Sequence, residues 1–77
     1  MRRYLVQTFR DDYLNVDILV TVYEVLKLIE DNEYGTIAIV KTNKSEGWVI
    51  ECHFLEEFLQ YDYKFSDDEK YDNWINQ

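Results

Sequence analysis

The sequence predicts a small α+β domain: an antiparallel four-stranded sheet in the order β-β-α-β-β, one helix packed on the sheet, and a C-terminal helix. Three observations carry this prediction. Two segments alternate apolar and polar residues with the period of a strand, two segments carry capping-box patterns typical of helix starts, and 77 residues are enough for one domain. Residues 1–77 are therefore expected to form a single acidic domain.

The first two segments predict a hairpin. Residues 3–9 are rich in aromatic and β-branched types and stop at a polar cluster, which indicates a strand. In residues 14–20 apolar side chains occupy every second position, which is the pattern of a strand with one buried face. The two strands are expected to turn at Asp11 and Asp12.

The next segment favours a helix over residues 22–32. Thr21 is followed three residues later by Glu24, which fits a capping box, and Gly35 supplies a break after the last turn. A competing interpretation starts a longer helix within residues 14–20, because the apolar residues there also continue a helical stripe. The two interpretations differ in whether the first hairpin exists.

Residues 36–42 and 48–54 predict a second hairpin. The first run is rich in β-branched residues, the second alternates cleanly, and the loop between them contains a glycine. A short helical turn and then an extended segment, residues 61–65, are expected to follow.

A capping-box pattern formed by Ser66 and Glu69 predicts a terminal helix over residues 67–75. Acidic residues in its first turn suit the positive end of the helix dipole. Three apolar residues are expected to dock it on the sheet: Tyr71, Trp74 and Ile75.

The apolar face of each predicted element defines an expected core. It consists of eight residues: Val16, Ile18, Val25, Leu26, Ile29, Ile39, Ile50 and Phe54.

The chain is acidic, but its hydrophobic content is typical of a protein that folds. Sixteen acidic residues face eight basic ones, for a net charge of -8, while 47% of the residues are hydrophobic. No apolar run approaches the ~20 residues of a membrane span, and the first residues lack the features of a signal peptide. A soluble protein of the cytoplasm, in a bacterium or a phage-infected host cell, with no membrane partner, is expected.

The residues that carry chemistry are too few for catalysis or metal binding. Cys52 and His53 are the only thiol and imidazole, and adjacent strand residues point to opposite faces, so they are not expected to meet. Cys52 shares the apolar face of its strand and is expected to be buried. We therefore expect no enzyme, no cofactor and no metal site, and the acidic charge argues against direct binding of nucleic acid.

The strongest functional signal is the mixture of acids and aromatic residues in residues 56–77. Seven acidic residues stand against two basic ones there. Such a field attracts basic partners, and Tyr and Trp are residue types that anchor interfaces. The expected partner-binding residues are Glu56, Glu57, Tyr61, Asp62, Tyr63, Asp67, Asp68, Asp72 and Trp74.

The expected partner is a basic protein that handles nucleic acid. In size and charge the chain resembles phage-encoded DNA mimics that block restriction, CRISPR or repair enzymes. This resemblance, which is one of composition, implies an inhibitor whose carboxylates stand where phosphates would lie, as in anti-CRISPR or anti-restriction proteins. The alternative hypothesis is a structural or regulatory module that acts by homodimerisation or by pairing a sheet edge with a partner protein.

Overall fold

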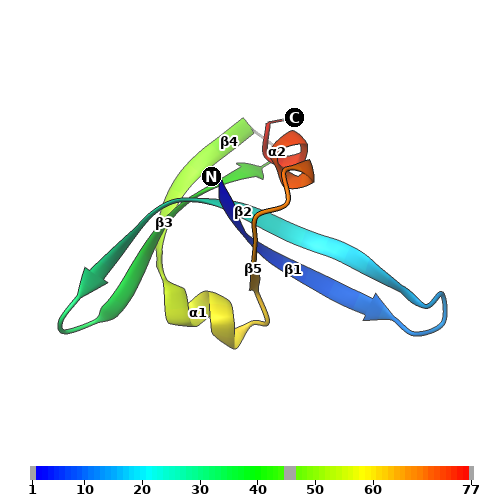
Figure 1. The fold of residues 1–77 in the computed structure, drawn as a ribbon, viewed down its shortest axis with the longest axis horizontal. Coiled ribbons are helices and arrows are strands. Elements are labelled where there is room, and N and C mark those ends of the chain that lie inside the picture. The colour runs from blue at the N-terminus through cyan, green and yellow to red at the C-terminus, as the bar shows by residue number, and fades with distance from the viewer. Residues whose placement is uncertain (1, 45–46, 77) are drawn as a thin grey trace.

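The computed structural model describes residues 2–44 and 47–76. These residues form a five-stranded antiparallel sheet in the order β4-β3-β2-β1-β5, with two short helices (Figure 1). The elements in chain order are β1 (Arg3–Asp11), β2 (Val16–Asp31), β3 (Gly35–Lys44), β4 (Gly47–Phe54), α1 (Leu55–Gln60), β5 (Lys64–Ser66) and α2 (Lys70–Ile75).

The sheet is organised around β2, a strand of 16 residues. Its first part pairs with β1 and its second part with β3, and only Glu24 and Val25 belong to both registers. As a consequence, the β1–β2 hairpin projects at one end of the molecule and the β2–β3 hairpin at the other (Figure 1). The molecule is therefore elongated, with extents of 44 × 25 × 25 Å.

The prediction of a helix over residues 22–32 is wrong, and so is the alternative prediction of a longer helix. Residues 22–31 are the second part of β2, and Thr21 lies in the strand opposite Gln7 instead of capping a helix. β-branched residues recur along this segment and fit a pleated surface. Pairing with β1 up to Val25 and with β3 from Glu24 onward also supplies backbone hydrogen bonds in place of those that a helix would have made internally. The sheet accordingly gains a long central strand in place of the helix.

A β-bulge explains why this segment imitates a helix. Opposite β3 the register passes from Val25 directly to Lys27 and skips Leu26. A bulge reverses the alternation of side chains, so Val22 and Ile29 lie on the same face although they are seven residues apart. Seven residues are also two helical turns, so the apolar spacing fits both structures.

The two turns that flank β2 have the same construction. The carboxylates of Asp11 and Asp31 each accept hydrogen bonds from the backbone N–H groups two and three residues further on, at 2.8–3.1 Å. Each turn ends with a residue of positive φ, Asn15 at 57° and Gly35 at 83°. The donors are Tyr13 and Leu14 in the first turn and Glu33 and Tyr34 in the second. The first turn confirms the expected hairpin, whereas Gly35 closes a turn and does not end a helix.

Each face of the sheet carries a small core under one helix. Adjacent residues of β1 point to opposite sides, and we name the two sides the α2 face and the α1 face after the helix that covers each. The core of the α2 face contains the buried residues Tyr4, Val6, Val22 and Ile75. The core of the α1 face contains the buried residues Leu5, Ala38, Val40 and Phe58.

The core expected from the sequence is wrong, because none of its eight residues is buried. Val25 and Ile39 are half-buried, and the other six are exposed: Val16, Ile18, Leu26, Ile29, Ile50 and Phe54. In β4 the alternation is as expected but the faces are reversed. His53 lies inward against Phe58 of α1, with ring centroids 5.4 Å apart, and Cys52 on the opposite face is exposed instead of buried.

The remaining elements differ from the sequence prediction in two respects. The sheet has five strands instead of four, because the extended segment expected over residues 61–65 joins it as β5 at Lys64–Ser66, and the last helix starts later than expected. The second hairpin, the short helix after it and an extended segment are all present. Helix α2 begins at Lys70, and the expected capping box is wrong: Ser66 Oγ accepts the N–H of Asp68 at 3.2 Å, and the N-cap residue Glu69 makes no side-chain cap bond. The docking residues are confirmed, because Ile75 is buried in the α2-face core and Tyr71 and Trp74 pack against it.

We expect Leu5→Ala to lower the free energy of unfolding by ~2–5 kcal/mol, because Leu5 is fully buried. Leu26→Ala, the matched control, should cost well under ~1 kcal/mol, because the side chain sits in the bulge and is 46% exposed. Urea unfolding of both variants measures the difference. Equal losses would contradict the placement of these two leucines.

The turn at Asp31 predicts a pH dependence. The N–H groups of Tyr34 and Glu33 hold the pKa of the Asp31 carboxyl below its ordinary value of 3.8. A lowered folded-state pKa stabilises the fold above the ordinary value, and this contribution disappears as the pH falls through the folded-state pKa. Asp31→Asn keeps an acceptor oxygen but removes the titrating group. Its melting temperature should therefore fall less than that of the wild type between about pH 5 and about pH 2.

The matched control is Asp12→Asn in the other turn, where Asp12 accepts none of the turn hydrogen bonds. This variant should keep the wild-type decline at acid pH. A decline that is unchanged in Asp31→Asn would show that the turn carboxylate does not contribute.

Candidate partner-binding surface

The structure divides the nine predicted partner-binding residues into two groups, which accompany helices on opposite faces of the sheet. Figure 1 shows α1 and α2 at opposite ends of β5. The first group lies in α1 or in the segment after it: Glu56, Glu57, Tyr61, Asp62 and Tyr63. The second lies in α2 or in the segment before it: Asp67, Asp68, Asp72 and Trp74. The acids of residues 56–77 therefore do not form one continuous surface.

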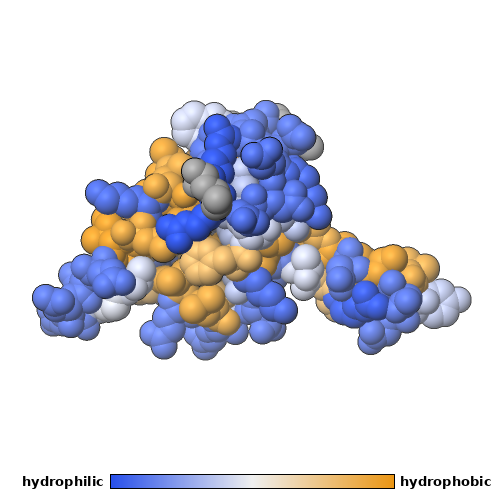
Figure 2. All heavy atoms as spheres, in the orientation of Figure 1, coloured by the Kyte–Doolittle hydropathy of each residue, from blue (hydrophilic) through white to orange (hydrophobic). Residues whose placement is uncertain are grey.

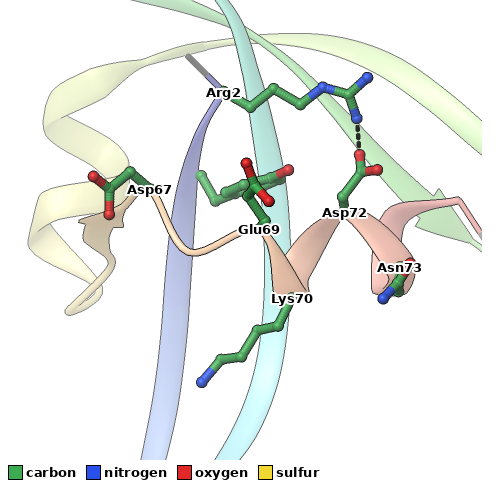
Figure 3. A pocket seen from close by; sticks show the side chains of 7 residues that line it. Arg2, Asp67, Glu69, Lys70, Asp72 and Asn73 are labelled. Carbon is green, nitrogen blue, oxygen red and sulfur yellow. Dashed lines mark hydrogen bonds and ion pairs between the residues drawn. The ribbon is translucent and has the colours of Figure 1, made fainter.

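Two residues of the α2 group, Asp67 and Asp72, line an open hollow of about 670 Å³ that carries charges of both signs. Figure 3 shows the guanidinium of Arg2 reaching to the carboxylate of Asp72, with which it forms a hydrogen-bonded ion pair. The ammonium of Lys70 lies 3.5 Å from a carboxylate oxygen of Asp68. Internal cations thus neutralise part of the acidity here. The lining residues are Arg2, Tyr4, Asp67, Glu69, Lys70, Asp72 and Asn73.

Tyr4 lies beneath this hollow with its ring 5.8 Å from that of Tyr71. The side chain is fully buried, and its hydroxyl has no hydrogen-bond partner among the residues that the structure describes. Burial raises the pKa of the Tyr4 phenol, and the charge of Glu24 raises this pKa further. Trp74 packs against the same core and thereby helps to hold α2 on the sheet.

The α1 group contributes to a groove of about 500 Å³ between α1 and the β2–β3 turn, which we name the acidic groove. Its lining residues are Glu33, Tyr34, Phe54, Glu56, Glu57 and Gln60, so among the described residues the lining contains three glutamates and no basic side chain. The rings of Tyr34 and Phe54 lie 6.3 Å apart and give the groove an aromatic component. A negative groove with exposed aromatic rings results.

The carboxylates of the acidic groove are largely free of internal partners. Glu33 and Glu56 form no ion pair with another residue in the described ranges 2–44 and 47–76. Glu57 lies 3.8 Å from Nδ1 of His53, which is charged only when protonated. These carboxylates can therefore pair with an external cation without breaking a bond inside the protein.

Next to the groove, aromatic rings pack around His53. Tyr23, Phe58 and Tyr63 form a cluster with centroid distances of 5.0–5.8 Å, and Tyr63 is half-buried, which raises the pKa of its phenol. Tyr61 lies at the rim of this cluster and is 64% exposed. Tyr61 is thus accessible to a partner, whereas Tyr63 belongs largely to the core.

Glu51 connects this cluster to β3 and lies outside the acidic groove. Its carboxylate accepts a hydrogen bond from Nζ of Lys44 at 2.9 Å and lies 3.2 Å from Nε2 of His53. These two contacts, that of Lys44 first, lower the pKa of Glu51. This acid therefore has structural partners, unlike Glu33 and Glu56.

Glu33 and Tyr34 were not expected as site residues, because the segment before them was interpreted as a helix. The signal that could have placed them is the repeated turn. Asp31 stands four residues before Gly35, as Asp11 stands four residues before Asn15. Recognising a second turn of this construction predicts a hairpin whose tip is brought near the end of β4.

Comparison of the chain with known protein families, with curated proteins and with solved structures finds no match. Neither α1 nor α2, the two helices of the described residues, has the length and apolar content needed to cross a membrane. Within residues 2–44 and 47–76, His, Cys, Asp and Glu side chains do not gather in threes in a way that could hold a metal ion.

The unpartnered hydroxyl of Tyr4 predicts the effect of removing it. Tyr4→Phe should leave the stability unchanged or raise it by up to about 1 kcal/mol, because a buried polar group without a hydrogen bond costs desolvation energy. Tyr61→Phe is the matched control at an exposed ring and should have no effect. Thermal unfolding measures both variants, and a loss of stability in Tyr4→Phe would show that the hydroxyl does have a partner.

Proposed function

We propose that the protein is a non-catalytic binding protein whose acidic groove captures a basic surface of another protein. The observation that carries this proposal is the composition of the groove, which combines three glutamates with two aromatic rings and, among the described residues, no basic side chain. The hollow beside α2 is a weaker candidate, because Arg2 and Lys70 already neutralise part of its charge.

Charge and aromatic residues have separate roles in this proposal. The net charge of -8 attracts a basic partner over distance and raises the rate of association. The exposed rings of Tyr34 and Tyr61, 63% and 64% accessible, then supply contact area at modest entropic cost. Capture would accordingly be fast and sensitive to salt.

The more specific form of the proposal is an inhibitor that covers the nucleic-acid-binding surface of its target. Carboxylates and phosphates are both bound by arginine through paired hydrogen bonds, so a row of glutamates can occupy a surface that normally receives nucleic acid. The small size and acidic composition support this form, which includes phage-encoded counter-defence of the anti-CRISPR or anti-restriction kind. Nucleic acid itself is disfavoured as a ligand because both molecules are negative.

The experiment compares two charge-neutralised variants. In the groove variant, Glu33, Glu56 and Glu57 are each replaced by Gln. The matched control removes the same number of charges near α2 by Asp67→Asn, Asp68→Asn and Glu69→Gln. The probe is an oligo-arginine peptide with a fluorescent label, and binding to each protein is followed by anisotropy across a salt series.

We expect the groove variant to bind the peptide at least about tenfold more weakly and with a flatter salt dependence, because three negative charges that attract and pair with the peptide are lost. The α2 control should retain most of the affinity. Equal losses in the two variants would show that only net charge matters, and a loss confined to the control would move the site to α2.

The inhibitory form has its own test. Proteins retained from bacterial lysate by the wild type but not by the groove variant are identified, and each is assayed for DNA or RNA binding with and without the protein. Displacement of nucleic acid by the wild type alone is the expected result. Retained proteins that do not bind nucleic acid would restrict the proposal to basic protein surfaces in general.

A further inference from the structure

Within residues 2–44 and 47–76, two groups of apolar side chains are exposed to solvent. The first, which we name the arm, is the outer part of the β1–β2 hairpin, where Phe9, Val16 and Ile18 share one side. The second, which we name the patch, lies on the α2 face of β3 and β4 and includes Trp48, Ile50 and Phe54. Figure 2 shows apolar side chains gathered over β3 and β4 and again along the arm.

Among the residues that the structure describes, no strand outside the hairpin pairs with the arm. Beyond the short strand β5, which pairs only with residues 4–6, β1 has β2 as its single neighbour. Phe9 stands directly opposite Ile18 in the register, and the two side chains are 60% and 44% exposed. A two-stranded ribbon is marginally stable in water by itself. Binding of a partner that covers the exposed apolar side chains would therefore be favourable, because it removes apolar surface from water.

The patch is equally unusual for an isolated protein. Trp48 and Ile50 are 58% and 56% exposed, and the register places Ile29, Ile37 and Phe54 side by side across three strands. Monomers rarely expose continuous apolar surface of more than a few hundred Å². The patch therefore has the character of half an interface.

The two surfaces cannot cover each other within one chain. Phe9 points to the same side as Leu5 of the α1-face core, because side chains alternate along β1. The patch residues of β4 point to the side opposite His53, and thus to the α2 face. Arm and patch also belong to opposite ends of β2. An arm can reach a patch only in another copy.

We propose that the protein forms a two-fold symmetric homodimer in which the arm of each copy lies on the patch of the other. The charges around the two surfaces are complementary. The arm is negative overall, because Asp11, Asp12 and Asp17 stand against Arg10, which pairs with Asp12 and Asp17, whereas Lys27 and Lys41 border the patch. The Lys41 ammonium already lies 4.7 Å from the Trp48 ring centre, where it can meet an incoming carboxylate.

The buried area is sufficient for this dimer. With about half of each aromatic and aliphatic side chain exposed, one arm on one patch buries on the order of 600–800 Å². A symmetric dimer contains two such contacts and buries about 1,200–1,600 Å², which falls within the usual range for stable interfaces. Phe54 belongs to both the patch and the acidic groove. The groove glutamates Glu33, Glu56 and Glu57 take no part in either contact, and the variants below leave Phe54 unchanged, so this inference is tested independently of the proposed function.

Sedimentation equilibrium at ~100 µM, where even a micromolar dissociation constant gives a dimer, is the first test. The wild type should sediment at twice the chain mass of 9.4 kDa. The arm variant, Phe9→Thr with Ile18→Thr, and the patch variant, Trp48→Thr with Ile50→Thr, should each sediment as monomers. Leu59→Gln, which removes an exposed apolar residue of α1, is the matched control and should remain dimeric.

Mixing the two variants separates this arrangement from other dimers. The arm variant has an intact patch and the patch variant an intact arm, so a mixed dimer contains one complete contact whereas each variant alone contains none. Dimer should therefore reappear in the mixture. A monomeric wild type, an arm variant that stays dimeric, or a mixture of folded variants that stays monomeric would overturn the proposal.

A cross-link provides a measurement that leaves both surfaces nearly intact. Ile18→Cys places a thiol on the arm, and diamide oxidises it together with Cys52, which is exposed on the same side of β4 as the patch. The expected product is a covalent dimer in which residue 18 of one copy is joined to residue 52 of the other. A dimer joined only through two copies of residue 52 would overturn the arm-on-patch arrangement.

Discussion

The structure depends on the pairing of β2 with a different neighbour along each of its halves. Each part of this 16-residue strand is paired along one edge, the first part by β1 and the second by β3, and only Glu24 and Val25 are paired on both sides. This division spreads a small chain over a length of 44 Å. The position of each helix, groove and exposed surface follows from that spread.

A sheet this long cannot be covered by so short a chain. The helices α1 and α2 have six residues each and shield only the middle of the sheet, one on each face. Two small cores result, and the apolar residues near both ends of β2 remain in contact with water. The two cores stabilise the middle of the sheet, and the incomplete coverage of its ends leaves apolar surface available for interactions.

The charges follow the same geometry. Acids with internal cations gather around α2, where Arg2 fastens the helix to the start of β1. Acids without such partners meet between α1 and the β2–β3 turn, because β3 and β4 carry the chain from that turn back to α1. The proposed basic partner and the proposed second copy would therefore bind neighbouring regions that share Phe54, one electrostatically and the other mainly through apolar contact.

The sequence by itself determined the strand–turn–strand character of residues 3–20, the second hairpin, the short helix after it and the docking residues of α2, because these features depend on local period and turn chemistry. Tertiary structure decided the state of residues 22–31, where a bulge at Leu26 gives a strand the spacing of a helix and pairing with β3 settles the choice. It also decided the buried face of β4. Alternation identifies two faces, but only the position of Phe58 in α1 determines that His53 lies inward and Ile50 outward.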